Sequence, residues 1–322
     1  MRAAIYTRYG GPERLRLAEV APPQAQAGRM IVRVMAASVN SWDWDKLTGN
    51  LLGRIGGPFG PQHRCLGADI AGVVESVGPD VTAFRVGDRV LGDLTESGWG
   101  GFAELASADP RYFTAVPEAL DFPEAATIAQ AGLLAWQGLT LGGALQPGRS
   151  VLINGAGGGM GSFAVQMAKR AGAIVTAVDS AAKAGLMREL GADTVLDYRR
   201  TDFAALDARY DAVLDAMARR PMRAQLSVLN RGGRYVVAGG SVRALLATAL
   251  RGQTLGREAD TRCDLLFWRP DEGDMAVVAQ MVASGDIRVP IDEVYPLAET
   301  ARAMARIGAG ESLAKLVVLP QL

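Results

Sequence analysis

The chain carries very little thiol or imidazole chemistry, with two cysteines and one histidine among 322 residues. Cys65 and Cys263 cannot form a disulfide framework, which indicates a reducing compartment and predicts a cytoplasmic protein. His63 and Cys65 lie two positions apart, but two candidate ligands do not make a tetrahedral zinc site. We therefore predict no metal site.

Net charge and long apolar runs are missing as well. Lys+Arg and Asp+Glu number 34 each, so there is no electrostatic case for a nucleic-acid or anionic-membrane partner. No apolar run reaches membrane-spanning length, and the first residues are typical of a strand rather than a signal peptide. The composition, 49% hydrophobic and 21% charged, is that of a globular protein long enough for two domains.

The local pattern changes once along the chain. Before Pro123, short alternating segments separated by Gly and Pro predict strands that close into a compact partial barrel. After it, helical patterns, the first over 124–145, alternate with strands and predict a doubly wound parallel sheet. The region 241–262 is ambiguous, and the C-terminal segment is expected to return to the first domain. The predicted class is α/β, with domains at 1–123 plus 269–322 and at 124–268.

A stretch from 150 to 179 contains a buried strand, a glycine-rich turn, a helix over 162–170 and a second strand that ends in Asp179. This succession predicts a dinucleotide-binding unit, because a helix N-terminus offers N–H groups and positive dipole to a pyrophosphate. A triphosphate-binding loop would need Lys directly after its last glycine, where Ser162 stands. The alternative is a purely structural glycine loop.

In this order, the motifs resemble the medium-chain dehydrogenase/reductase superfamily, specifically its zinc-independent, quinone-oxidoreductase-like branch. The resemblance spans essentially the whole chain, and it is carried by segments that include AASVNSWDWDKLTG (36–49), LGADIAGVVESVG (66–78), NGAGGGMGSFAVQMAK (154–169) and RGGRYVVAGG (231–240). It implies a β-rich GroES-like domain joined to a Rossmann domain. Where zinc-containing relatives carry metal ligands, this chain has Asn40, Ala68 and about Ala131, none of which binds zinc.

Without zinc, an alkoxide has no Lewis acid to stabilise it, whereas reduction of a conjugated acceptor spreads charge over the acceptor. The resemblance thus implies an NAD(P)H-dependent oxidoreductase that transfers hydride to a quinone or an α,β-unsaturated carbonyl. A zinc-free alcohol dehydrogenase or ketoreductase is one alternative. A non-enzymatic cofactor-binding protein is another, because no unambiguous general acid is visible. The resemblance also implies a homodimer.

The resemblance places Asn40 beside the nicotinamide and the substrate. Its polar neighbours Asp43, Asp45 and Lys46 are further catalytic candidates, with solvated or structural roles as the alternative. Trp42 and Trp44 would either wall an aromatic substrate or pack at a domain interface. The predicted cofactor-binding residues are Asn154, Ala156, Gly157, Gly158, Gly159, Met160, Gly161, Asp179, Ser180, Lys183, Tyr198, Ala238, Gly239, Phe267, Trp268 and Lys315.

The sequence gives conflicting indications about the nicotinamide. Asp179 ends the second strand, where a carboxylate accepts hydrogen bonds from the ribose 2′-OH of NAD and repels a 2′-phosphate. However, Ser180, Lys183 and Tyr198 match positions where NADP-dependent relatives hold that phosphate, and Arg199–Arg200 add positive charge nearby. Together these groups slightly favour NADP(H) over NAD(H).

Overall fold

Segments from the two ends of the chain fold together in the computed structural model, which describes all 322 residues. Residues 1–130, 270–285 and 289–322 form unit 1, and residues 131–269 with 286–288 form unit 2. The chain leaves unit 1 after residue 130, because α2 (Phe122–Ala125) still contacts β3 and β4 of unit 1. The predicted domain boundaries at 123/124 and 268/269 stay predictions, which limited proteolysis would test.

Unit 1 is built on a mixed sheet in which the strands follow the order β14-β15-β3-β4-β5-β7, with β6 also paired to β3. These strands are β3 (Met30–Val39), β4 (Asp69–Val77), β5 (Arg89–Asp93), β6 (Leu105–Ala108), β7 (Phe113–Ala115), β14 (Ile291–Pro296) and β15 (Lys315–Leu319). A separate two-stranded sheet pairs β1 (Arg2–Ile5) with β2 (Arg16–Glu19). The C-terminal strand β15 therefore lies inside the sheet, parallel to β14 and antiparallel to β3.

Three longer helices belong to unit 1, namely α1 (Ser41–Thr48), α8 (Glu272–Ala283) and α9 (Thr300–Ala309). Helix α1 packs on α9, where the ring of Trp44 lies against Gly308. A Cβ atom at Gly308 would be 2.2 Å from Trp44 Cη2, so only glycine allows this contact. Trp44 therefore packs within unit 1 itself.

Unit 2 is a six-stranded sheet in the order β10-β9-β8-β11-β12-β13, and all its neighbouring strands are parallel. Its strands are β8 (Ser150–Asn154), β9 (Ile174–Asp179), β10 (Thr194–Asp197), β11 (Tyr210–Asp215), β12 (Leu229–Val237) and β13 (Arg262–Leu265). Strands β9 and β10 follow on one side of β8, and β11, β12 and β13 follow on the other side. Because parallel crossovers are right-handed, this order puts helices on both faces of the sheet. The predicted α/β class with a doubly wound parallel sheet is confirmed.

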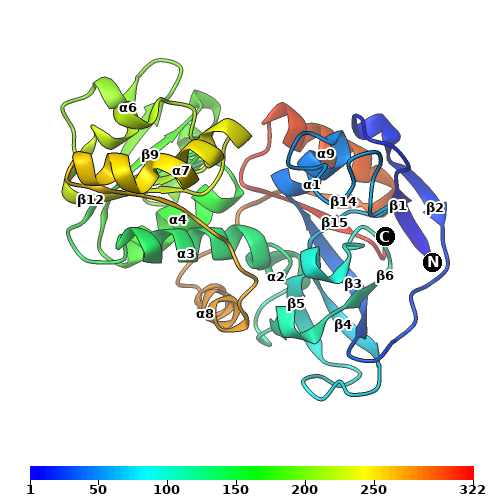
Figure 1. Ribbon diagram of the computed structural model, residues 1–322. Helices are drawn as coiled ribbons and strands as arrows, with labels where there is room; N and C mark the ends of the chain where they lie inside the picture. The colour runs from blue at the N-terminus through cyan, green and yellow to red at the C-terminus, as the bar shows by residue number, and fades with distance from the viewer. The chain divides into compact units, whose positions relative to one another are not determined.

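The helices of unit 2 are α3 (Leu133–Gly142), α4 (Gly159–Arg170), α5 (Ala184–Glu189), α6 (Met222–Leu226) and α7 (Val242–Glu258) (Figure 1). Helix α3 packs on α4, and α7 packs on β13. Short 3-10 helices occur at Pro12–Arg14, Thr95–Ser97, Pro110–Tyr112, Ala181–Lys183, Phe203–Ala205 and Leu297–Glu299. None of the helices is both long enough and apolar enough to cross a membrane.

Several predicted element boundaries were wrong. The single helix expected over 124–145 is interrupted by a π-helical turn at Ile128–Gly132, and its last part ends at Gly143, whose φ is +64°. Helix α4 begins at Gly159 rather than at Ser162, because the glycines of the turn adopt helical conformation at its N-terminus. The ambiguous region 241–262 contains α7, and Ser241 caps this helix by accepting a hydrogen bond from Ala244 N.

Candidate functional site

A row of polar side chains crosses the sheet of unit 1. Ser38 on β3 lies opposite Asp69 on β4, and Asp69 lies opposite Asp93 on β5. All three residues are fully buried, at 0% exposure. Ser38 Oγ donates to Asp69 Oδ2 at 3.0 Å. Because burial of an unpaired carboxylate is strongly unfavourable, this row requires both hydrogen-bond donors and a cation nearby.

Asn40 and Lys315 supply the donor and the cation. Asn40, directly after β3, donates from Nδ2 to Asp69 Oδ2 at 3.1 Å and to Ser38 Oγ at 3.3 Å. Lys315, the first residue of β15, donates from Nζ to Asn40 Oδ1 at 2.6 Å. Asn40 is 8% exposed and Lys315 is 2% exposed. The Asn40 amide therefore lies between a carboxylate and an ammonium inside unit 1.

Asp43 is held by the backbone on both of its carboxylate oxygens. Oδ2 accepts from Asn40 N at 2.8 Å, which completes a capping box at the start of α1. Oδ1 accepts from Gly67 N at 2.9 Å. Burial raises the pKa of Asp43 to about 7, against the lowering effect of these two hydrogen bonds. Asp43 thus links α1 to the segment before β4.

Gln130 connects the two facing carboxyls. Its backbone N donates to Asp69 Oδ2 at 3.3 Å, and its Nε2 donates to Asp93 Oδ2 at 3.1 Å. Asp93 Oδ1 accepts from the backbone N of Thr95 at 2.7 Å and also from the Thr95 hydroxyl. Asp69 Oδ1 is buried without any hydrogen-bond partner. Burial raises the pKa of Asp69 and of Asp93, and the charge of Asp69 raises that of Asp93 further.

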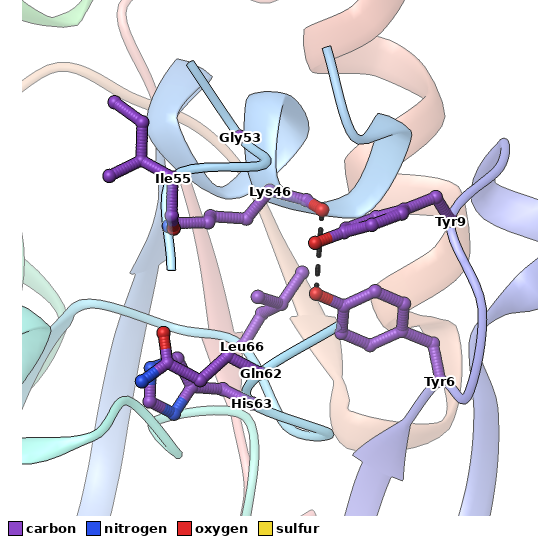
Figure 2. Close-up of a pocket in the computed structure, with 8 residues that line it drawn as sticks. All are labelled: Tyr6, Tyr9, Lys46, Gly53, Ile55, Gln62, His63 and Leu66. Atoms are coloured by element: carbon purple, nitrogen blue, oxygen red, sulfur yellow. Dashed lines mark hydrogen bonds between the residues drawn. The ribbon is translucent and has the colours of Figure 1, made fainter. Parts of the chain in front are cut away.

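The other two predicted catalytic residues do not join this network. Lys46 lines a small pocket of unit 1 together with Tyr6, Tyr9, Gly53, Ile55, Gln62, His63 and Leu66 (Figure 2). In Figure 2 its side chain runs toward Ile55, and Nζ donates to Ile55 O at 3.0 Å. The Lys46 carbonyl accepts from the Tyr6 hydroxyl at 3.4 Å. Asp45 Oδ1 accepts from Asn50 Nδ2 at 2.5 Å.

The predicted glycine turn of unit 2 follows β8 and leads into α4. A Cβ atom at Gly161 would lie 2.2 Å from Gly155 O and 2.4 Å from Ala156 Cα, so helix and turn can meet only at glycine. Gly155 has a φ of +88°, which L side chains rarely adopt. In contrast, the nearest atom to a Cβ at Gly158 is Gly155 O at 3.4 Å. The turn therefore has a tightly packed side and an open side.

Asp179 joins the second strand to this turn. Its Oδ2 accepts from Gly157 N at 3.0 Å and its Oδ1 accepts from Ser180 N at 2.7 Å. Lys183 Nζ lies 4.0 Å from Asp179 Oδ1. The stem of Lys183 covers Gly157, because a Cβ there would be 2.6 Å from Lys183 Cβ. Both oxygens of the carboxylate are thus occupied within unit 2.

Two further predicted groups lie near the carboxyl ends of strands in unit 2. Tyr198 follows β10, whose Asp197 pairs with Asp179, and the Arg199 guanidinium stacks 5.6 Å from the Tyr198 ring centroid. Ala238 and Gly239 follow β12, and a Cβ at Gly239 would lie 2.6 Å from Ala216 O.

Phe267 and Trp268 follow β13, which ends at Leu265 rather than at the predicted 268. Phe267 is exposed, whereas Trp268 Nε1 is buried without a hydrogen-bond partner. Lys315 is the one residue of the predicted cofactor set that belongs to unit 1.

The sequence reasoning missed the carboxylates that organise each unit. Asp215, which ends β11, accepts from Asn154 Nδ2 at 2.7 Å, from Met217 N and Ala218 N at 2.8 Å, and from the Tyr235 hydroxyl at 2.5 Å. Asp69 and Asp93 were missed in the same way. The available signal was an acidic residue at one end of a mostly apolar strand, where burial of the carboxylate requires a partner.

The chain is similar to known proteins along its whole length. Residues 26–118 match the family described as alcohol dehydrogenase GroES-like domain, and residues 190–318 match the family described as zinc-binding dehydrogenase. The chloroplast envelope quinone oxidoreductase homolog of Arabidopsis thaliana is 31% identical over 99% of this chain and 98% of that protein. The 2-methylene-furan-3-one reductase of Solanum lycopersicum is 32% identical over 75% of this chain and 63% of that protein. Among solved structures, the quinone oxidoreductase from Coxiella burnetii superposes with a TM-score of 0.90 at 26% identity, with 99% of each chain covered.

Proposed function

Because the chain belongs to the medium-chain dehydrogenase/reductase superfamily, in its quinone-oxidoreductase-like branch, we propose that it reduces a quinone or an α,β-unsaturated carbonyl with NAD(P)H. The observation that carries this proposal is the glycine turn of unit 2, with Asp179 and Lys183 beside it at the carboxyl end of the parallel sheet. When it is bound to unit 2, NAD(P)H would supply the hydride.

The residues of unit 2 fit a dinucleotide. The open side of the turn at Gly158 leaves room for a pyrophosphate, and α4, which has Gly158 as its N-cap residue, supplies the N–H groups of its first turn next to it. We propose that NADP(H) is preferred. Asp179 is already bound by two backbone N–H groups and faces Lys183, which offsets its charge toward a 2′-phosphate. Ser180, Lys183, Tyr198 and Arg199 supply hydroxyl groups and positive charge in the same place.

We further propose that the reaction uses no zinc. By the resemblance, the positions that match the ligands of zinc-containing relatives hold Asn40, Ala68 and about Ala131, and neither alanine has a donor atom. The amide oxygen of Asn40 already accepts from Lys315. In addition, no three His, Cys, Asp or Glu side chains are grouped so that they could hold a metal ion.

The hydrogen bonds of the Asn40 amide limit what this residue could do for a bound acceptor. Both N–H groups of its amide are used, one by Ser38 and one by Asp69. In this arrangement, Asn40 offers no hydrogen to an acceptor carbonyl. The roles of Asp43, Asp45 and Lys46 in catalysis stay predictions. For Asp43, the two backbone hydrogen bonds favour a structural role.

The test is NAD(P)H oxidation by the purified protein with 1,4-benzoquinone, an enone and a simple ketone, each with both nicotinamides. We expect turnover with the quinone and the enone and little with the ketone. Ketone reduction as the main activity would favour the zinc-free ketoreductase alternative. Tight cofactor binding without oxidation by any acceptor would favour a non-enzymatic cofactor-binding protein. Retained activity after dialysis against a chelator would support zinc independence.

We also propose a cytoplasmic homodimer. The two cysteines are unpaired, which suits a reducing compartment. Light scattering coupled to gel filtration would test the dimer, because the monomer mass is 33.9 kDa.

A further inference from the structure

Lys315 is the one basic residue that is fully buried in this protein. The chain has 34 basic residues, of which only Lys46, Lys169, Lys183 and Lys315 are lysines. Arginine is therefore the usual cation here, yet the buried position holds the more compact ammonium, which has three donors on a flexible stem. The surroundings of Lys315 contain the buried carboxyls of Asp43 and Asp69.

The hydrogen bonds around Lys315 have a definite direction. Asp69 accepts from the Asn40 NH₂ group, and the Asn40 carbonyl accepts from Lys315 Nζ. The amide cannot turn round, because its oxygen would then face the Asp69 carboxylate and its NH₂ group would face the ammonium. The two hydrogen bonds therefore form a chain with its negative end at Asp69 and its positive end at Lys315. One hydrogen bond leaves two of the three N–H groups of the ammonium unused.

Stability alone does not account for this arrangement. Removing charges from water is expensive, and buried ion networks are often no more stable than apolar groups of similar volume. Asp69 Oδ1 even lacks a hydrogen-bond partner. A buried, oriented cation next to a predicted substrate-contacting residue is instead the arrangement that stabilises developing negative charge.

We propose that Lys315 supplies the positive charge that stabilises the acceptor oxyanion during reduction, with Asn40 and Asp69 as positioning residues that hold its ammonium. This inference rests on the proposed function. The acceptor carbon gains the hydride with its two electrons, and the conjugated π electrons move onto the carbonyl oxygen. That oxygen then takes a proton from water, so Lys315 begins and ends the cycle as an ammonium.

The first experiment compares Lys315→Met and Lys315→Arg with the wild-type protein, and uses Lys169→Met as the matched control. Lys169 is the partly exposed partner of Asp193 on the surface of unit 2. For Lys315→Met we expect kcat to fall about 100- to 1000-fold with an enone, and less with benzoquinone, whose anion is more delocalised. The melting temperature should fall, because Lys315→Met leaves the buried Asp69 carboxylate without its cation. The NADPH dissociation constant should change less than about threefold, because the proposed role of Lys315 is toward the acceptor.

Lys315→Arg should retain more activity than Lys315→Met because it keeps the charge. The deuterium isotope effect with reduced [4-²H]NADPH should increase in Lys315→Met as hydride transfer becomes slower. Equal fold-losses of kcat with the enone and with benzoquinone would overturn the proposal in favour of a structural lysine. Unchanged kcat in Lys315→Met would overturn it as well.

The second experiment tests the positioning role of Asp69 without relying on activity. The charged groups that face Lys315 are Asp69 from β4 and Asp43 from α1, and Asp69 in turn raises the pKa of Asp93 on β5. Protein labelled with ¹³C at lysine Cε should give four signals, and Lys315→Met identifies the one from Lys315. We expect Asp69→Asn to lower the titration midpoint of that signal by about one pH unit or more, because a stabilising negative charge is lost.

The alkaline limb of the kcat/KM profile should move by the same amount in Asp69→Asn. It should not move when Asp69→Asn is combined with Lys315→Arg, since arginine stays protonated. An unchanged lysine titration in Asp69→Asn would overturn the positioning role. Wild-type protein that oxidises no nicotinamide would instead reject the proposed function, and the lysine titration would still report on the coupling of Asp69 to Lys315.

Discussion

Asp69 and Asp93 face each other on neighbouring antiparallel strands, and both carboxyls are completely buried. Like charges directly opposite each other in a sheet are destabilising, and burial adds to the penalty. The pKa of each carboxyl is raised mainly by burial. Because Asp69 has Lys315 near it and Asp93 has no cation in the network, the structure favours ionised Asp69 and protonated Asp93.

The stability of the protein should therefore depend on pH through Asp93. A carboxyl whose pKa is raised in the folded state contributes stability that is fully present below its unfolded pKa, about 3.9. This contribution is lost as pH rises through the higher folded pKa. We expect the free energy of unfolding to fall between pH 5 and pH 9, and Asp93→Asn to remove about 1–3 kcal/mol of that decrease.

Urea unfolding at several pH values measures the free energy of unfolding. The exposed Glu118→Gln serves as the control, and equal pH dependence in all three proteins would contradict the prediction.

The two sides of the glycine turn should respond differently to the same substitution. Gly161→Ala places a Cβ atom 2.2 Å from Gly155 O, so we expect a loss of about 1–3 kcal/mol in stability together with loss of cofactor binding. Gly158→Ala meets no atom closer than 3.4 Å and should fold normally. It should still weaken NADPH binding about tenfold or more, because the methyl group would hold a pyrophosphate away from the backbone. Calorimetric titration and thermal melts on both variants test this. Normal NADPH affinity in Gly158→Ala would place the pyrophosphate elsewhere.

The nicotinamide preference should change in opposite directions in two variants at the end of β9. Asp179→Ala removes a carboxylate and should raise the ratio of kcat/KM for NADPH over NADH. Lys183→Ala removes the ammonium 4.0 Å from that carboxylate and should lower the same ratio about tenfold. The measurement is kcat/KM for both cofactors at one acceptor concentration. An unchanged ratio in Asp179→Ala would exclude a role for this carboxylate in the preference.

Both thiols should be inert in the folded protein. Burial raises the pKa of Cys65 and of Cys263 to about 12, so almost no thiolate is present at neutral pH. Cys65 Sγ also donates to Phe102 O at 3.3 Å. We expect no reaction with a disulfide reagent at pH 8 in native protein, and two equivalents in denaturant. Rapid release of one equivalent under native conditions would show that Cys65 is accessible.

The dinucleotide-binding unit was predictable because its signals are local. The strand, the glycines, the helix and Asp179 follow one another within one stretch of chain, and Gly161 has a packing reason that any such turn shares. Even here the first residue of the helix was misjudged. The positions of the glycines do not reveal that Asp179 is bound to Gly157 N, and that contact changes how its charge acts on a cofactor.

The buried network of unit 1 was beyond prediction because it depends on strand register. Asp69 and Asp93 meet only through the pairing of β4 with β5, and Lys315 reaches Asn40 across 275 positions of sequence. No local pattern carries such information. The same reason applies to Trp44, whose packing partner Gly308 lies on a distant helix. Asn40 was named as a residue of interest from the resemblance, and the orientation of its amide required the structure.

The position of β15 between β14 and β3 has a consequence for biosynthesis. A ribosome releases β3, β4 and β5 first, then the whole of residues 131–269, and only afterwards the strand that carries Lys315. The central parallel-sheet unit can therefore complete its folding while the first sheet still has an open edge. Until residues 315–319 arrive, the Asp69 carboxyl has no ammonium near it. The first part of the protein to be synthesised is thus the last to complete its sheet.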